Sequence, residues 1–144
     1  MIRGIKCIVV IAALALPVIA VAQTEVKTKS VPAKPTSAAS GQEMYREYCA
    51  SCHGLTGKGD GPAAPALKTP PANLSTLSAR NNGQFPEAKV IQSIKAGPQI
   101  PAHGSAEMPV WGGIFLALRT SPNDAEVQLR ARNLMNYIKT LQSN

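Results

Sequence analysis

The chain has 144 residues and a formal net charge of +7, with 15 lysine and arginine residues against 8 acidic ones. This length allows one small domain and a short additional segment. The positive charge favours acidic docking surfaces on protein partners, or anionic membrane surfaces. No basic cluster is interleaved with aromatic residues, which argues against nucleic acid as a partner.

Residues 1–22 have the pattern of a secretory signal peptide. Arg3 and Lys6 form a basic start, residues 8–16 form an apolar run, and small residues precede a cleavage position before Gln23. The apolar run is short for a membrane-spanning helix, which needs about 20 apolar residues. We therefore expect a cleaved leader and a periplasmic or otherwise exported protein. The alternative is an uncleaved membrane anchor, and membrane association is expected only in that case.

Residues 23–40 are rich in proline, lysine and small residues and have no apolar periodicity. Such a composition cannot bury enough apolar surface to offset the entropy of ordering the backbone. We expect a flexible linker over these residues and a folded domain over residues 41–144.

Three segments of this domain have helical periodicity, and none alternates as a strand does. The first covers residues 42–51, and the second covers residues 86–96 and ends before Gly97. We expect Ser121 to cap the third helix, with Pro122 in its first helical position. Its apolar stripe consists of Val127, Leu134, Ile138 and Leu141.

Glycines and prolines interrupt residues 54–71 and residues 101–113, where we expect irregular loops with at most short helical turns. The predicted fold class is therefore all-α, with three to five helices. Aromatic residues make up only 4% of the chain, so a domain of this size has a thin core of its own. A large apolar cofactor at the centre would supply the missing core.

Cys49, Cys52 and His53 form a C-x-x-C-H motif, the pattern of c-type haem attachment. Positions i, i+3 and i+4 share one helix face, so both thiols can reach one porphyrin while His53 approaches its iron. A structural zinc site would need further ligands, and a thioredoxin-like dithiol would need a βαβ pattern that is absent here. The third cysteine, Cys7, belongs to the predicted leader. The motif therefore predicts one covalently bound haem c.

Around this motif, residues 41–144 resemble class I c-type cytochromes. The matches fall in the family's two crossing terminal helices and in the loop after the motif, at Gly41, Tyr45, Leu134, Tyr137 and residues 57–62. The resemblance implies a small cytochrome c fold around one haem. It also implies single-electron transfer to redox protein partners in an extracytoplasmic electron-transport chain, by a carrier rather than an enzyme.

Members of this family usually complete the iron coordination with a methionine on a downstream loop, and Met108 matches this position. Met108 lies 55 residues after His53, which is enough chain to enclose a porphyrin. Met44 is on the predicted attachment helix and Met135 on the terminal helix, so position excludes both. His103 is the rival axial ligand, and a second histidine would give a lower potential than a thioether.

Other residues have subsidiary predicted roles. The second ring nitrogen of His53 needs an acceptor, and the resemblance implies a loop proline carbonyl, from either Pro62 or Pro65. Trp111 is expected either to pack on the haem edge and donate to a propionate or to be an ordinary core residue. Four lysines either rim an exposed haem edge or belong to the solvated surface: Lys58, Lys68, Lys89 and Lys95.

Two other classes of function compete with an electron carrier. A haem enzyme would need an open iron position and a distal acid or base, for which His103 is the histidine candidate. A gas-binding or sensing module would need an open or displaceable sixth ligand. The sixth ligand of the resting protein distinguishes all three classes, and each is compatible with a subunit of a larger complex.

The leader gives a direct prediction. Protein from an exporting host should begin at Gln23, and intact-mass measurement should show the loss of residues 1–22. If those residues are retained and the protein stays in the membrane fraction, the segment is an anchor.

Overall fold

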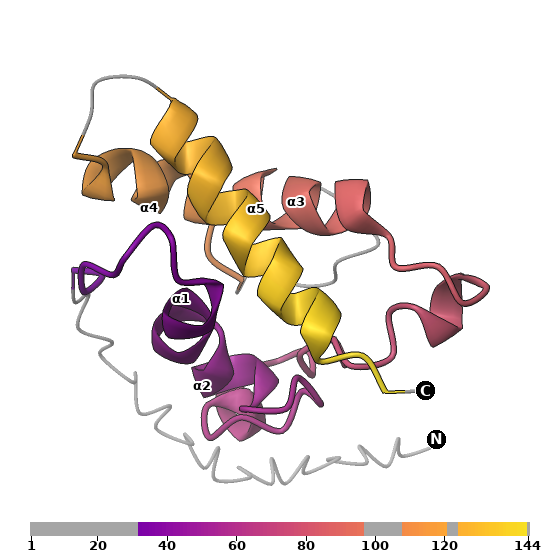
Figure 1. Cartoon of the computed structure of the whole chain (residues 1–144). Helices are drawn as coiled ribbons and strands as arrows, with labels where there is room; N and C mark the ends of the chain where they lie inside the picture. The colour runs from indigo at the N-terminus through magenta and orange to yellow at the C-terminus, as the bar shows by residue number, and fades with distance from the viewer. Residues whose placement is uncertain (1–31, 97–107, 121–123, 144) are drawn as a thin grey trace, which may run out of the picture. The chain divides into compact units, whose positions relative to one another are not determined.

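The computed structural model of the chain describes residues 32–96, 108–120 and 124–143. Within these ranges the regular secondary structure is entirely helical, which confirms the predicted all-α class (Figure 1). The elements are α1 (Gly41–Tyr48), α2 (Ala50–His53), the 3-10 turns η1 (Ala64–Ala66) and η2 (Ala79–Asn81), α3 (Glu87–Ala96), α4 (Trp111–Leu118) and α5 (Ala125–Thr140). The predicted leader and His103 lie outside the described residues.

The close crossing of α1 and α5 joins the two ends of the domain (Figure 1). At Gly41, a side-chain Cβ would overlap the backbone carbonyl oxygen of Asn133. Next to this contact the rings of Tyr45 and Tyr137 lie 5.3 Å apart between centroids. Only glycine therefore allows the two backbones to approach this closely.

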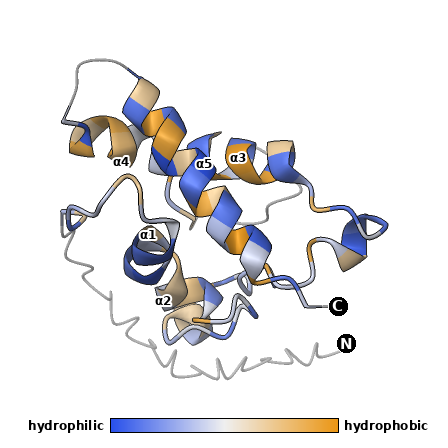
Figure 2. Cartoon of the chain, in the orientation of Figure 1, coloured by the Kyte–Doolittle hydropathy of each residue, from blue (hydrophilic) through white to orange (hydrophobic). Residues whose placement is uncertain are grey.

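The core contains side chains from α1, α3, α4 and α5 around this crossing. Its largest fully buried side chains are Met44, Tyr45, Phe115 and Leu134. The apolar stripe predicted for the last helix is buried at Val127, Leu134 and Ile138, and Leu141 packs partly against it. Figure 2 shows α5 with alternating apolar and polar residues along its length, and α4 as mostly apolar.

The attachment region contains two helices where the sequence predicted one over residues 42–51. The break falls at Cys49, whose backbone has φ −114° and ψ −37°. The N–H groups of Cys52 and His53 both donate to the Cys49 carbonyl oxygen, at 3.1 and 2.8 Å. The chain therefore bends at Cys49 and restarts as the single turn α2.

Helix α4 replaces the end of the loop predicted over residues 101–113, so the loop prediction is wrong at Trp111, Gly112 and Gly113. A Cβ at Gly112 would overlap the carbonyl oxygen of Lys95, near the end of α3. Gly112 therefore lets α4 pack closely on α3, and the helix then continues through the apolar residues 114–118. This apolar run was the available signal, and the paired glycines obscured it.

The boundaries of the other two predicted helices differ only slightly. Helix α5 begins at Ala125 with Asp124 in the N-cap position, later than the predicted start at Pro122. Ser121 and Pro122 lie outside the described residues. Helix α3 begins at Glu87, and Val90 and Ile94 of its predicted apolar face are buried.

Residues 33–38 pack on α1 and α5, although the sequence placed them in a flexible linker. We call this segment the strap. Side chains of the two helices donate to its backbone carbonyls: Tyr48 to Lys34, Arg130 to Thr36 and Asn133 to Ala38. These bonds give an irregular segment the partners that its own backbone lacks. The packed unit therefore starts before Gly41, where the sequence placed the domain boundary.

The helix crossing gives a stability prediction. Gly41→Ala should lower the free energy of unfolding by about 1–3 kcal/mol, because the added methyl group must push α5 away. The control is Gly113→Ala on α4, where an added Cβ meets nothing within 4 Å. This control should gain about 0.5–1 kcal/mol from helix propensity. Denaturant unfolding measures both variants, and equal effects would contradict the assigned role of Gly41.

Candidate functional site

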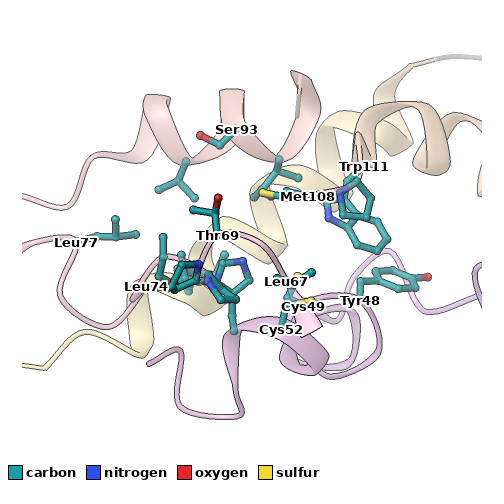
Figure 3. A pocket seen from close by; sticks show the side chains of 18 of the residues that line it. Tyr48, Cys49, Cys52, Leu67, Thr69, Leu74, Leu77, Ser93, Met108 and Trp111 are labelled. Atoms are coloured by element: carbon teal, nitrogen blue, oxygen red, sulfur yellow. Dashed lines mark hydrogen bonds between the residues drawn. The ribbon is translucent and has the colours of Figure 1, made fainter. Parts of the chain in front are cut away.

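A large pocket opens beside α2 and α3 (Figure 3). It contains about 1240 Å³ of empty space, part of which is open to solvent. Its walls are mainly apolar and come from α1 and α2, residues 67–80, α3, residues 108–111 and α5: Tyr48, Cys49, Cys52, His53, Leu67, Thr69, Pro70, Pro71, Ala72, Leu74, Leu77, Arg80, Val90, Ser93, Ile94, Met108, Pro109, Trp111 and Ile138. Segments distant in sequence therefore form one apolar chamber.

Both motif cysteines line this pocket as free thiols. Cys49 is buried at the bend between α1 and α2, and Cys52 lies one turn further along. Burial, with a smaller effect of Cys52, raises the pKa of the Cys49 thiol to about 12. Among the described residues, no group of three histidine, cysteine or acidic side chains is arranged to hold a metal ion.

His53 also lines the pocket, and a backbone carbonyl holds its ring. The Nδ1 atom lies 2.9 Å from the carbonyl oxygen of Ala72. A carbonyl oxygen can only accept, so Nδ1 carries the proton and Nε2 keeps its lone pair. Burial lowers the pKa of His53, and this effect is larger than the opposite effect of the hydrogen bond to Ala72. The lowered pKa favours the neutral ring. The acceptor is thus Ala72, not the predicted Pro62 or Pro65.

The loop after the motif folds back onto α2 and brings Ala72 into place. The N–H of Gly59 donates to the His53 carbonyl at 2.8 Å, and the N–H of Leu74 donates to the Gly57 carbonyl at 2.6 Å. Gly57 and Gly59 have positive φ values of 77° and 83°, which glycine adopts without strain. The sequence signal that could have pointed to Ala72 as the partner of His53 is the rigid pair Pro70 and Pro71 directly before it.

The end of α2 is fixed from the core side. The buried hydroxyl of Tyr45 donates to the carbonyl oxygen of Gly54 at 2.8 Å. Burial is the largest cause of the strongly raised pKa of Tyr45, so this hydroxyl stays a donor. Two hydrogen bonds therefore support the position of His53: the Tyr45 bond to the neighbouring Gly54 and the bond from its own ring to Ala72.

Met108 lines the pocket together with the motif residues, and it packs partly buried against the core. In the view of Figure 3 it lies above Cys49 and Cys52. The other candidates behave differently, since Met44 and Met135 are buried in the helical core and do not line the pocket.

Trp111 is buried in the core, as one of its two predicted roles requires, and it also lines the pocket. Its packing on a haem edge stays a prediction. Its ring stacks on Tyr48, with centroids 5.0 Å apart and planes at 27°. Tyr48 belongs to the periodic face that predicted the first helix, but it had no predicted role in the site. Its place next to Cys49 at the end of an amphipathic helix was the available signal.

The predicted place of four lysines around an exposed haem edge stays a prediction. Lys58, Lys68 and Lys89 are exposed, Lys95 is half-buried, and none of them lines the pocket. Arg80 does line it, and its guanidinium donates to the carbonyl oxygen of Asn73. No sequence pattern around Arg80 predicts this position. The course of the loop after the motif brings Arg80 to the pocket.

Residues 38–142 match the family described as Cytochrome c, which covers well over half of the chain. The chain belongs to the cytochrome c family. The predicted all-α class and the observed helical architecture agree with this family. Membership of the family also supports haem-based electron transfer as the general function. The pocket fits haem c, because two free thiols and a neutral histidine line a chamber with mainly apolar walls.

A curated relative is the "Cytochrome bc1 complex cytochrome c subunit" of Corynebacterium diphtheriae, which is 29% identical over 104 residues. The match covers 58% of this cytochrome and 37% of the relative, so the chain spans little more than a third of the relative's length. In the described part of the chain, no helix is long and apolar enough to cross a membrane.

Proposed function

We propose that this cytochrome is a mono-haem electron carrier in which Cys49 and Cys52 attach the haem covalently. His53 and Met108 are the axial ligands of its iron. One observation carries the proposal: Met108 lines the same pocket as the C-x-x-C-H motif, although 55 residues separate it from His53.

Each of these residues has a distinct task. Haem supplies the one-electron couple when bound. His53 offers Nε2 as a ligand, because Ala72 holds the proton on Nδ1 and fixes the ring plane. Cys49 and Cys52 fix the cofactor to the bend at α2. The thioether of Met108 favours a higher potential than a second histidine would.

The apolar walls serve the same task. They exclude water from the cofactor and keep the surroundings similar in both oxidation states, which suits rapid electron transfer. A haem enzyme or a gas-binding module would instead need an open or displaceable sixth position. The methionine in the pocket wall therefore supports the carrier.

We further propose that the protein works outside the cytoplasm, on the strength of its leader-like residues 1–22. The relative's name supports a redox protein as partner, in or near a respiratory complex. Without Arg3 and Lys6 the chain keeps 13 basic residues against 8 acidic ones, a net charge of +5. This charge favours an acidic docking surface on the partner.

Covalent attachment can be tested on the cysteines. The wild-type protein should carry one haem per chain by intact mass, and it should keep haem stain after denaturation. Replacing Cys49 and Cys52 together by serine should abolish the stain, because no thioether can form. Cys7→Ser is the matched control and should leave it unchanged. Haem that extracts freely from the wild type into acidic solvent would contradict the assignment.

The axial ligand can be tested on the methionines. Met108→Ala should remove the methionine–iron charge-transfer band, admit small ligands and lower the reduction potential, within the roughly 0.8 V that axial ligands span. The control is the buried Met135→Ala, which should cost about 2–5 kcal/mol of stability and keep the band. The ligand assignment fails if Met108→Ala leaves spectrum and potential unchanged while His103→Ala alters both.

A further inference from the structure

Tyr48 connects the pocket to the strap. Its ring lines the pocket and stacks on Trp111. Its hydroxyl is at the opposite end of the side chain and donates to the Lys34 carbonyl oxygen at 2.7 Å. The same hydroxyl lies 2.8 Å from the Thr36 hydroxyl. One side chain thus contacts the site at one end and the strap at the other.

The donors and acceptors of this contact have one consistent arrangement. The single hydroxyl proton of Tyr48 goes to the Lys34 carbonyl, so the Thr36 hydroxyl must donate to Tyr48. Arg130 in turn donates to the Thr36 hydroxyl at 3.2 Å and to the Thr36 carbonyl at 3.0 Å. The four groups form one directed chain of hydrogen bonds, in which each bond strengthens the next.

This chain of bonds continues to the far end of α4. The side chain of Arg130 is only 4% exposed and pairs with Glu126, with Nη2 to Oε1 at 2.8 Å. The other carboxylate oxygen of Glu126 accepts from the Thr120 N–H at 2.8 Å and from its hydroxyl at 2.9 Å. Thr120 lies just beyond Leu118, the last residue of α4.

The network therefore holds α4 at both ends, through the Tyr48–Trp111 stack at its start and the Glu126–Thr120 bonds beyond its end. Met108 lies three residues before Trp111, in the segment that leads directly into α4. A shift of α4 must move this short segment. The hydrogen bonds of the strap therefore help to fix the position of Met108, the proposed ligand.

We propose that Tyr48 is a positioning residue that the strap holds through Thr36, and that together they keep Met108 in its place in the haem pocket. This inference rests on the proposed function, because it takes Met108 as the axial ligand. Loss of a bond in the network shifts the balance between methionine-bound and methionine-free iron. A purely structural network would change global stability alone.

The experiment uses the full-length holoprotein and the variants Tyr48→Phe and Thr36→Val, which remove one hydroxyl each and keep side-chain shape. Imidazole binding to the ferric protein reports how readily Met108 leaves the iron. One net hydrogen bond corresponds to roughly a five- to tenfold change in an equilibrium constant. Both variants should bind imidazole roughly five- to tenfold more tightly and weaken the methionine–iron band on mild warming. The imidazole affinity of the double variant should rise by less than the product of the two single increases, because both hydroxyls belong to one chain of hydrogen bonds.

Two controls separate positioning from stability. Lys34→Ala removes an exposed ion pair with Glu47 but keeps the Lys34 carbonyl, so it should leave imidazole binding unchanged. Gly41→Ala destabilises the helix crossing without removing a donor or acceptor of the Tyr48–Thr36 contact, and it should lower the unfolding midpoint without a matching gain in imidazole affinity. If Tyr48→Phe and Thr36→Val behave like Gly41→Ala, the network is only structural and the inference is overturned. If the wild-type protein already lacks the methionine–iron band, the proposed ligand itself is wrong and the inference falls with it.

Discussion

The contact between α1 and α5 is the constraint on which the rest of this cytochrome depends. Gly41 lies against the Asn133 carbonyl, so the first and last helices touch through their backbones. Helix α1 ends directly at the bend that carries Cys49, and α5 also contacts α3 and α4. One close crossing therefore fixes the attachment motif relative to the helices that form the other pocket walls.

The site is completed by irregular segments, whose positions depend on hydrogen bonds to the helices. The loop after the motif returns over α2 because Gly57 and Gly59 adopt positive φ, and it delivers the Ala72 carbonyl to His53. The strap packs on α1 and α5 because the side chains of Tyr48, Arg130 and Asn133 donate to its carbonyls. Both segments have compositions typical of flexible loops, and side chains or carbonyls of the helices order them.

Helix α4 shows why local patterns are an incomplete guide. Two adjacent glycines are a loop signal by propensity, yet both are helical here. Gly112 is required because the Lys95 carbonyl occupies the space of its side chain, whereas Gly113 faces open space. The packing of α4 on α3 outweighs the low helix propensity of glycine. The two residues in contact, Lys95 and Gly112, are 17 positions apart in the sequence.

By itself, the sequence determined the all-α class, the spacing of the C-x-x-C-H motif, the buried stripe of the last helix and the helical positions of Met44 and Met135. These features depend on spacing within one or two helical turns, which neighbouring residues control. Only the tertiary structure decided that Ala72 is the partner of His53, that Arg80 reaches the pocket, that residues 111–118 are helical and that the strap is packed. Each of these depends on a donor, an acceptor or a close backbone contact supplied by a segment distant in sequence, which no local pattern encodes.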